Sequence, residues 1–302
     1  MTVVTLPAVP GLAGLYARGA TRRAGGTTLP DVEYRVTGVR ADPERLTAYQ
    51  HLLGEPAADQ LPAGFVHVLA FPVATALMAR PDFPLRLLGM VHLANRVTQR
   101  RAVQLGETLE VRARAVDLRA HHRGTQVDLV TTVHSAGASG ASGASGDGGV
   151  PDPTEIWRGV STYLAPGVRL PDADVPDRAD RADFRPPTPT GRWRYPADRG
   201  RRYAAVSGDA NPIHLSALSA KAFGFPRAIA HGMDTAARAL ATVGSARGEA
   251  FSWTVEFAAP VLLPSTPTMA IRRDEAGYGY TVWDANRGKL HLHGRVDALP
   301  SE

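Results

Sequence analysis

The sequence predicts an α+β protein built from two similar halves, each a long helix packed on an antiparallel sheet. Apolar residues alternate with polar ones over several short stretches, as in half-buried strands, and recur with the helical period over fewer, longer stretches. A Pro-, Asp- and Arg-rich stretch over residues 166–190 separates two blocks that repeat this order of elements. The 302 residues, 44% of them apolar, are enough to form sizeable cores.

The chain begins with 30 residues of Gly-, Pro- and Thr-containing sequence without sustained periodicity, so we expect a loose N-terminal tail or strap. Apolar residues then alternate over residues 32–36 as in a strand. Asp42 is a good N-cap, Pro43 suits the first helical position and Gly54 suits the end of a helix. The first ordered elements are therefore a strand and a helix over residues 43–53.

The rest of the first half is predicted to be one helix and several strands. The helix covers residues 68–79, and the strand candidates lie at 87–97, 109–118, 126–134 and 155–163. Between the last two strands, residues 136–149 repeat Ala, Ser and Gly, a composition that buries too little apolar area to order itself. We expect a floppy hairpin loop there.

The second half is predicted to repeat the first. Residues 1–165 form an N-terminal repeat, residues 166–190 a linker, and residues 191–302 a C-terminal repeat. Helices are expected at 198–206 and 215–223, followed by a long helix that starts near Gly232 and by strands at 268–273, 278–284 and 289–296.

Equal spacing supports the duplication. Residues 91–97 and 255–261 share an apolar frame, and His67 and His231 precede them by equal distances. This alignment places Val68 in the first half opposite Gly232 in the second.

Composition excludes several classes of protein. Without cysteine there is no disulfide, thiolate nucleophile or thiolate metal site. We found neither a leader sequence nor an apolar run long enough to span a bilayer, so a cytoplasmic protein without membrane contact is expected. The net charge of +5 comes almost entirely from arginine, which either suits an anionic partner or simply solubilises the surface. The arginines are not interleaved with aromatic residues, so nucleic acid is not an expected partner.

One short segment carries the candidate chemistry. Asn211-Pro212 must leave helical geometry, so Asp209 and His214 lie on either side of a tight turn and can converge on one small volume. A carboxylate and an imidazole that share one water form an acid-base pair. Gly232, at the expected start of the long helix, can offer a free backbone N–H to a developing negative charge.

The segment over residues 203–214, Tyr-Ala-Ala-Val-Ser-Gly-Asp-Ala-Asn-Pro-Ile-His, resembles the hydratase 2 signature of MaoC-like proteins. The resemblance implies a double hot-dog fold, in which each of two repeats is a long helix wrapped by a curved antiparallel sheet. It implies a hydro-lyase that interconverts trans-2-enoyl and (R)-3-hydroxyacyl thioesters in fatty-acid metabolism, with no cofactor. The catalytic residues implied are Asp209, His214 and the oxyanion donor Gly232.

The remaining assignments complete this hypothesis. We assign Ser207, Asn211 and Arg227 to substrate binding, the last through phosphates of the acyl carrier. The first half lacks the motif, so it is expected to be non-catalytic and to shape the acyl tunnel. Two repeats in one chain make either a monomer or a homodimer possible.

Two alternatives to this hypothesis remain open. Coenzyme A is the favoured carrier, but the same chemistry on acyl-carrier-protein substrates would leave the same motif. A non-catalytic acyl-thioester-binding subunit is also possible, because Asp209 could merely cap a helix and His214 could be a core histidine. No metal is expected, since His291 and His293 alternate on one strand face that we expect to be exposed.

Overall fold

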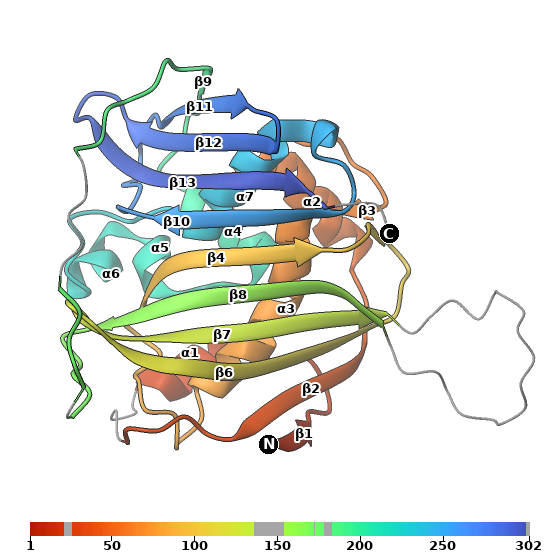
Figure 1. The fold of residues 1–302 in the computed structure, drawn as a ribbon, viewed down its shortest axis with the longest axis vertical. Helices are drawn as coiled ribbons and strands as arrows, with labels where there is room; N and C mark the ends of the chain where they lie inside the picture. Colours follow the sequence, from red (N-terminus) through yellow and green to blue (C-terminus); the bar gives the residue numbers. More distant parts are fainter. Residues whose placement is uncertain (21–25, 136–153, 172, 178–182, 300–302) are drawn as a thin grey trace, which may run out of the picture.

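The computed structural model describes residues 1–20, 26–135, 154–171, 173–177 and 183–299. The whole of the predicted loop over residues 136–149 and part of the predicted linker lie outside these residues. The described part forms one sheet with helices on one side of it (Figure 1). The α+β class predicted from the sequence is confirmed.

The main sheet has 11 strands in a mirrored order around a central antiparallel pair. The pair is β4 (Val91–Gln99) and β10 (Phe251–Phe257), which lie side by side in Figure 1 with Thr254 opposite Arg96. Beside β4 follow β8 (Thr154–Pro166), β7 (Gly124–Ser135), β6 (Leu109–His121), β2 (Val32–Val39) and β1 (Thr2–Thr5). Beside β10 follow β13 (Lys289–Ala298), β12 (Gly277–Asp284), β11 (Thr268–Arg273) and β9 (Gly191–Arg192). Apart from β1, the two sides have the same number and order of strands.

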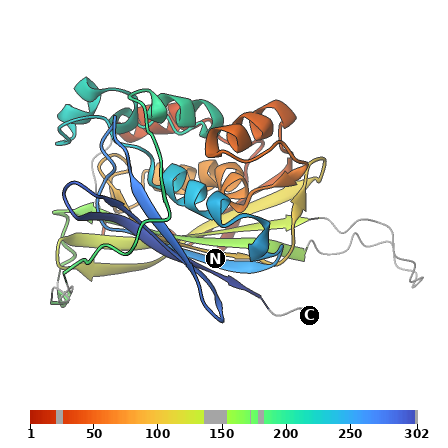
Figure 2. The same ribbon diagram turned by 90° about the horizontal axis from the view of Figure 1, so that it is seen from above.

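The helices form two further layers (Figure 2). Next to the sheet lie α3 (Ala63–Met78) and α7 (Gly232–Val243), and every residue of α3 except Phe71 is buried. The outer layer contains α1 (Leu12–Ala20), α2 (Pro43–Leu53), α4 (Arg199–Ser207), α5 (Pro212–Leu215) and α6 (Ala217–Ala222). A short 3-10 helix, η1 (Gly244–Arg247), follows α7, and β3 (Gln60–Leu61) and β5 (Val103–Gln104) form a separate pair. None of the described helices is long and apolar enough to cross a bilayer.

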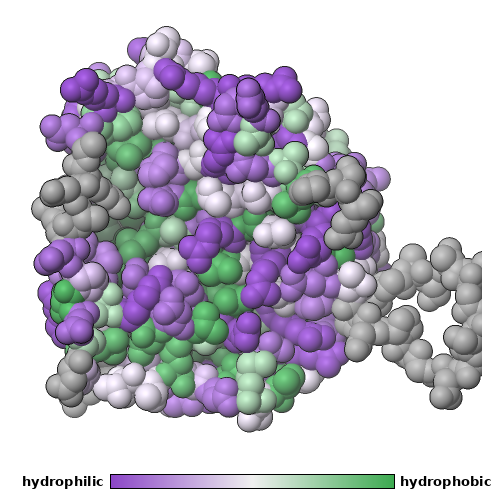
Figure 3. Space-filling model, in the orientation of Figure 1, coloured by the Kyte–Doolittle hydropathy of each residue, from purple (hydrophilic) through white to green (hydrophobic). Residues whose placement is uncertain are grey.

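The outward face of the sheet is covered by long polar side chains. Asp128 accepts a hydrogen bond from Thr162 and lies near the guanidinium groups of Arg96 and Arg119. Arginine stems cover apolar surface while their charged ends reach water, which explains why this face is mainly hydrophilic in Figure 3. Apolar atoms gather on it chiefly over the lower half, where the strands of the N-terminal half lie.

The prediction of a loose N-terminal tail was wrong. β1 pairs in parallel with β2, and α1 packs Leu12, Leu15 and Tyr16 into the core. These three residues have the i, i+3, i+4 spacing of a helix face. Gly14 between them, with Gly11 and Gly19 on either side, lowers helix propensity and concealed that pattern.

The alignment of the two halves that we drew from equal spacing does not match their helices and strands. α3 begins at Ala63, so Val68 lies more than one turn inside it, whereas Gly232 is the first residue of α7. β10 ends at Phe257, so residues 258–261 lie beyond the strand that we aligned with residues 91–97. Pro260 has no N–H for a ladder and favours this exit. The mirrored strand order, and not the spacing, supports a duplication; the domain boundaries remain a prediction.

Candidate active site

A cavity of about 530 Å³ lies between the two halves and is lined by both. From the C-terminal half come the loop that follows α4, the start of α7 and the end of β10. From the N-terminal half come α1, α3 and the neighbouring ends of β4 and β8. All three predicted catalytic residues, Asp209, His214 and Gly232, are in its wall.

Asp209 is held by a turn whose backbone is fixed on both sides. α4 ends at Gly208, whose φ of 77° favours glycine, and the N–H of Asp209 donates to Ser207 Oγ at 3.1 Å. The N–H of Asn211 donates to Asp209 Oδ1 at 3.2 Å, and Pro212 is the first residue of α5. Asn211 also caps α5 through its side chain, which accepts from the N–H of Ile213. Ser207 and Asn211 thus brace the turn and line the cavity.

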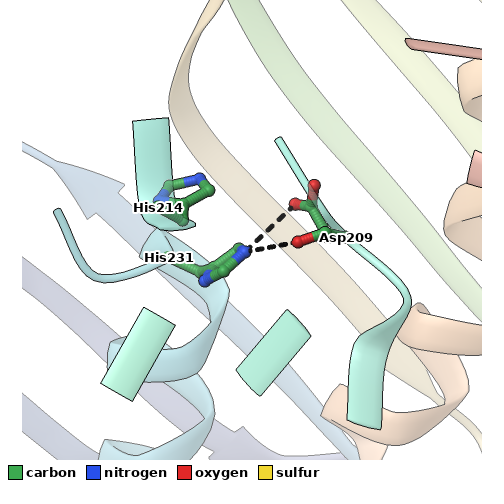
Figure 4. A group of neighbouring side chains, drawn as sticks. All are labelled: Asp209, His214 and His231. Atoms are coloured by element: carbon green, nitrogen blue, oxygen red, sulfur yellow. Dashed lines mark hydrogen bonds and ion pairs between the residues drawn. The ribbon is translucent and has the colours of Figure 1, made fainter. Parts of the chain in front are cut away.

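His214 and His231 complete the cluster around Asp209 (Figure 4). A carboxylate oxygen of Asp209 and one ring nitrogen of each histidine lie within 4.8 Å of one another. Nδ1 of His214 is 2.9 Å from the carbonyl oxygen of Ile229. In a neutral imidazole this nitrogen therefore carries the proton, and Nε2 keeps a free lone pair. His231 directs Nε2 at the backbone carbonyl of Asp209, 2.9 Å away.

The carboxylate of Asp209 has one occupied and one available oxygen. Oδ1 accepts a hydrogen bond from the hydroxyl of Tyr16 at 2.6 Å, in addition to the N–H of Asn211. Oδ2 faces His231 Nε2 at the longer distance of 3.7 Å. The side chain is 18% exposed, so a small molecule in the cavity can reach it. Burial alone would raise the pKa of Asp209, but His231, His214 and the hydrogen bonds hold it below its ordinary value.

Burial lowers the pKa values of the histidines in the cavity wall. Burial lowers the pKa of His214 to about 3, and the neighbouring His231 adds to the effect. Burial likewise lowers the pKa of His67 to about 4 and that of His92 to about 3. At neutral pH the site therefore combines one carboxylate with imidazoles that can accept a proton.

The cluster of one carboxylate and two imidazoles has the composition of a metal site but not the ring geometry of one. The rings of His214 and His231 are 3.6 Å apart between centroids, with 26° between their planes. An imidazole binds a metal through a lone pair in the plane of its ring, and two nearly parallel rings cannot direct both lone pairs at one ion. The arrangement suits proton transfer better, and a metal-free site remains our prediction.

Gly232 places a backbone N–H at the cavity. It is the first residue of α7, so its N–H has no acceptor within the helix and lies at the positive end of the helix dipole. A Cβ at this position would be 2.9 Å from the ring of Phe257, which also lines the cavity. Glycine thus permits close packing between the start of α7 and the end of β10.

Neither Arg227, which was assigned to the carrier phosphates, nor the nearby Arg199 lines the cavity. Arg227 is exposed and is not part of the cavity wall, although Phe225 and Ile229 on either side of it are. Arg199 is buried and forms two hydrogen bonds with the carboxylate of Asp234, so it is not available to a ligand. Its remaining nitrogen donates to the carbonyl of Leu52, at the end of α2.

Several residues of the wall were not predicted from the sequence. Tyr16 was assigned to a tail, and His231 was used only to align the two halves. His291 was expected to be exposed, but it is buried against the carbonyl of Ala259. His92 and Tyr163, stacked at 4.5 Å, belong to strands with no recognisable motif. Only the helical spacing around Tyr16 offered a signal.

Comparison with known proteins identifies the family. A model described as MaoC like domain matches residues 179–284. Over 271 residues the chain is 35% identical to 3-hydroxyacyl-thioester dehydratase X of Mycobacterium tuberculosis, covering 90% of this chain and 91% of that protein. The chain belongs to the MaoC-like dehydratase family. This family membership makes it a homologue of a hydro-lyase.

Solved structures of this family have the same fold. The crystal structure of HtdX from Mycobacterium tuberculosis matches with a TM-score of 0.73 and 33% identity, over 88% of this chain and 100% of that one. A MaoC-like dehydratase from Phytophthora capsici matches with a TM-score of 0.65, over 91% of this chain and 98% of that one; at 17% identity it bears on the fold alone. The hot-dog fold expected from the sequence is confirmed.

Proposed function

We propose that this MaoC-like protein is a 3-hydroxyacyl-thioester dehydratase that interconverts trans-2-enoyl and (R)-3-hydroxyacyl thioesters. The observation that carries the proposal is the convergence of Asp209, His214 and the N–H of Gly232 on one cavity between the halves. The relative from Mycobacterium tuberculosis, 35% identical, is named a 3-hydroxyacyl-thioester dehydratase.

In the hydration direction, the site activates one water. Asp209 Oδ2 and the free Nε2 of His214 are both acceptors, so a water between them directs its two O–H bonds at them. A lone pair of the water oxygen then faces C3 of the enoyl group. As the O–C3 bond forms, one acceptor takes a proton from the water, and the same proton is returned to C2 on the same face. Dehydration follows these steps in reverse.

The electrons of the C2=C3 bond move toward the thioester carbonyl during this step. The oxygen therefore gains negative charge before C2 is protonated. The N–H of Gly232 points from the start of α7 and can donate a hydrogen bond to that oxygen. Loss of such a donor typically costs about 3 kcal/mol of barrier.

The acyl chain is proposed to occupy the apolar part of the cavity. This part is lined by side chains of the N-terminal half, among them Phe71, Met78, Leu87 and Met90. The half without the catalytic motif would thereby shape the acyl site.

Coenzyme A is the proposed carrier, with an acyl carrier protein as the alternative. Between residues 199 and 232 the only acidic residue is Asp209, while Arg201, Arg202, Lys221 and Arg227 are exposed. This surface favours the phosphates of coenzyme A, which arginine forks bind well. Arg227→Ala should raise KM for crotonyl-CoA without lowering kcat; a selective loss with the acyl-carrier-protein substrate alone would favour the alternative.

The function is tested by hydration of crotonyl-CoA, followed by the loss of enoyl absorbance and chiral analysis of the product. Asp209→Asn and His214→Gln should each lower kcat by about 10²- to 10⁴-fold, the range for general acid-base groups. Asp42→Asn is a matched control, because asparagine also caps a helix and Asp42 lies at the start of α2. Equal inactivity of wild type and variants on both carriers would instead favour a non-catalytic thioester-binding subunit.

A further inference from the structure

The contact between Tyr16 and Asp209 links the two halves of the chain at the site. Tyr16 lies on α1, 193 residues away from Asp209 in sequence, and its side chain lines the same cavity. The distance of 2.6 Å between Tyr16 Oη and Asp209 Oδ1 is that of a charge-assisted hydrogen bond. Leu12 and Leu15 anchor the same helix in the core.

The direction of this hydrogen bond is fixed by chemistry. An ionised carboxylate can only accept, so the phenol of Tyr16 donates. Burial raises the pKa of Tyr16, and the charge of Asp209 raises it further, so the phenol keeps its proton. Oδ1 then has two donors, Tyr16 Oη and the N–H of Asn211, and Oδ2 is left for the cavity.

We propose that Tyr16 is a positioning residue of the active site: it binds Asp209 Oδ1, fixes the orientation of the carboxylate and leaves Oδ2 to act on the reacting water. This inference rests on the proposed function. It assigns to the N-terminal half a direct part in the catalytic arrangement, beyond shaping the acyl site. Tyr16 acts through Asp209 and makes no bond to the reacting atoms.

The packing around α1 supports the contact between Tyr16 and Asp209. A Cβ at Gly208 would lie 3.6 Å from Leu12, so the first turn of α1 packs on the turn before Asp209. Arg45 of α2 donates from Nε to the carbonyl of Val206 at 2.6 Å. Two helices of the N-terminal half therefore hold the catalytic loop from outside.

The charge on Asp209 depends on every titratable group that faces it. These groups are Tyr16 on α1, His67 on α3, His92 on β4, Tyr163 on β8, Tyr203 on α4, His214 on α5 and His231 before α7. Among these side chains, Tyr16 and His231 lie within hydrogen-bond distance of Asp209. Tyr16 donates to the carboxylate, whereas His231 contacts the backbone carbonyl. Its removal should therefore raise the pKa of Asp209.

The first test is Tyr16→Phe, assayed over a range of pH with crotonyl-CoA. We expect kcat to fall about 10- to 100-fold with little change in KM, because the lost donor serves Asp209. The acid limb of the kcat/KM profile should move to higher pH by about one unit. A folded variant with an unchanged limb and kcat/KM within about two-fold of wild type would overturn the proposal.

The matched control is Tyr280→Phe. Tyr280 is also buried and hydrogen-bonded, accepting from Trp253 Nε1 at 2.7 Å, but it is outside the cavity wall. Its loss should lower stability without moving the acid limb. If both variants move the limb equally, the shift reports general loosening and the proposal fails.

Two further measurements separate the possible failures. If Tyr16→Phe does not fold, 3-fluorotyrosine at position 16 keeps the shape and strengthens the donor, so the acid limb should move to lower pH; no movement would reject the idea. The ¹³C carboxyl signal of Asp209, titrated in wild type and Tyr16→Phe, needs no activity. A shift in an inactive protein would support the contact while the proposed function fails, and no shift would reject the contact in either case.

Discussion

The chemistry of Asp209 depends on how its surroundings divide the two oxygens of one carboxylate. Oδ1 is bound by Tyr16 and by the N–H of Asn211, and Oδ2 faces the cavity. The imidazole of His214 is oriented in the same way, since the carbonyl of Ile229 fixes the proton on Nδ1. In the proposed mechanism, the acceptor atom of each side chain is the one that no protein group binds, which is a form of preorganisation.

Gly232 allows a test of this preorganisation. In Gly232→Ala the N–H remains, but the new Cβ meets the ring of Phe257 at 2.9 Å, and the start of α7 must move. We expect kcat to fall about 10- to 100-fold, less than for complete loss of a donor. Phe257→Leu in the Gly232→Ala background should restore part of kcat by relieving the contact. A fully active single variant would show that the position of this N–H is not critical.

At the scale of elements, a buried ion pair joins three helices. Arg199 at the start of α4 binds Asp234 in the first turn of α7 and the carbonyl of Leu52 at the end of α2. The pair holds α4, which precedes the loop that carries Asp209, against α7, which begins at Gly232. Without Asp234, a guanidinium would remain buried and unpaired.

Asp234→Asn should therefore lower the free energy of unfolding by about 3 kcal/mol, measured by urea denaturation. Asp274→Asn is the control, because Asp274 pairs with Arg295 at an exposed site where water screens the charges. We expect a much smaller effect for this control. Equal effects of the two variants would mean that the buried pair contributes no more than an exposed one.

The sequence predicted those elements whose signals are local. α2 runs from Pro43 to Leu53 as its cap residues Asp42 and Gly54 indicated, and β11 has its predicted bounds. Residues 215–223 were expected to form one helix, but Ser216 is extended and caps the separate helix α6. The contact of Tyr16 with Asp209 has no local signal at all, because only the folded topology brings α1 to the loop.

At the scale of the whole molecule, folding buries several uncharged histidines in one cavity. His67, His92 and His214 have pKa values of about 4, 3 and 3, lowered mainly by burial. In the unfolded chain each would titrate near its ordinary value of about 6.5. Protonation therefore favours unfolding once the pH falls below that value.

Stability should accordingly decrease from about pH 6.5 down to about pH 4, by about 1.4 kcal/mol per pH unit for each of these histidines. Urea denaturation at several pH values in this window measures the slope. His67→Gln should reduce the slope, because it removes one of these buried groups. A flat dependence would show that the cavity admits water and accepts charged histidines.

The β4–β10 pair also determines how the protein responds to dilution. If two separate chains supplied these strands, the sheet and the cavity between them would exist only above a threshold concentration. Here both strands belong to one chain, so their pairing is intramolecular and its effective concentration is constant. The pairing of these two strands should thus be independent of the protein concentration, and both halves of the cavity wall belong to the same chain.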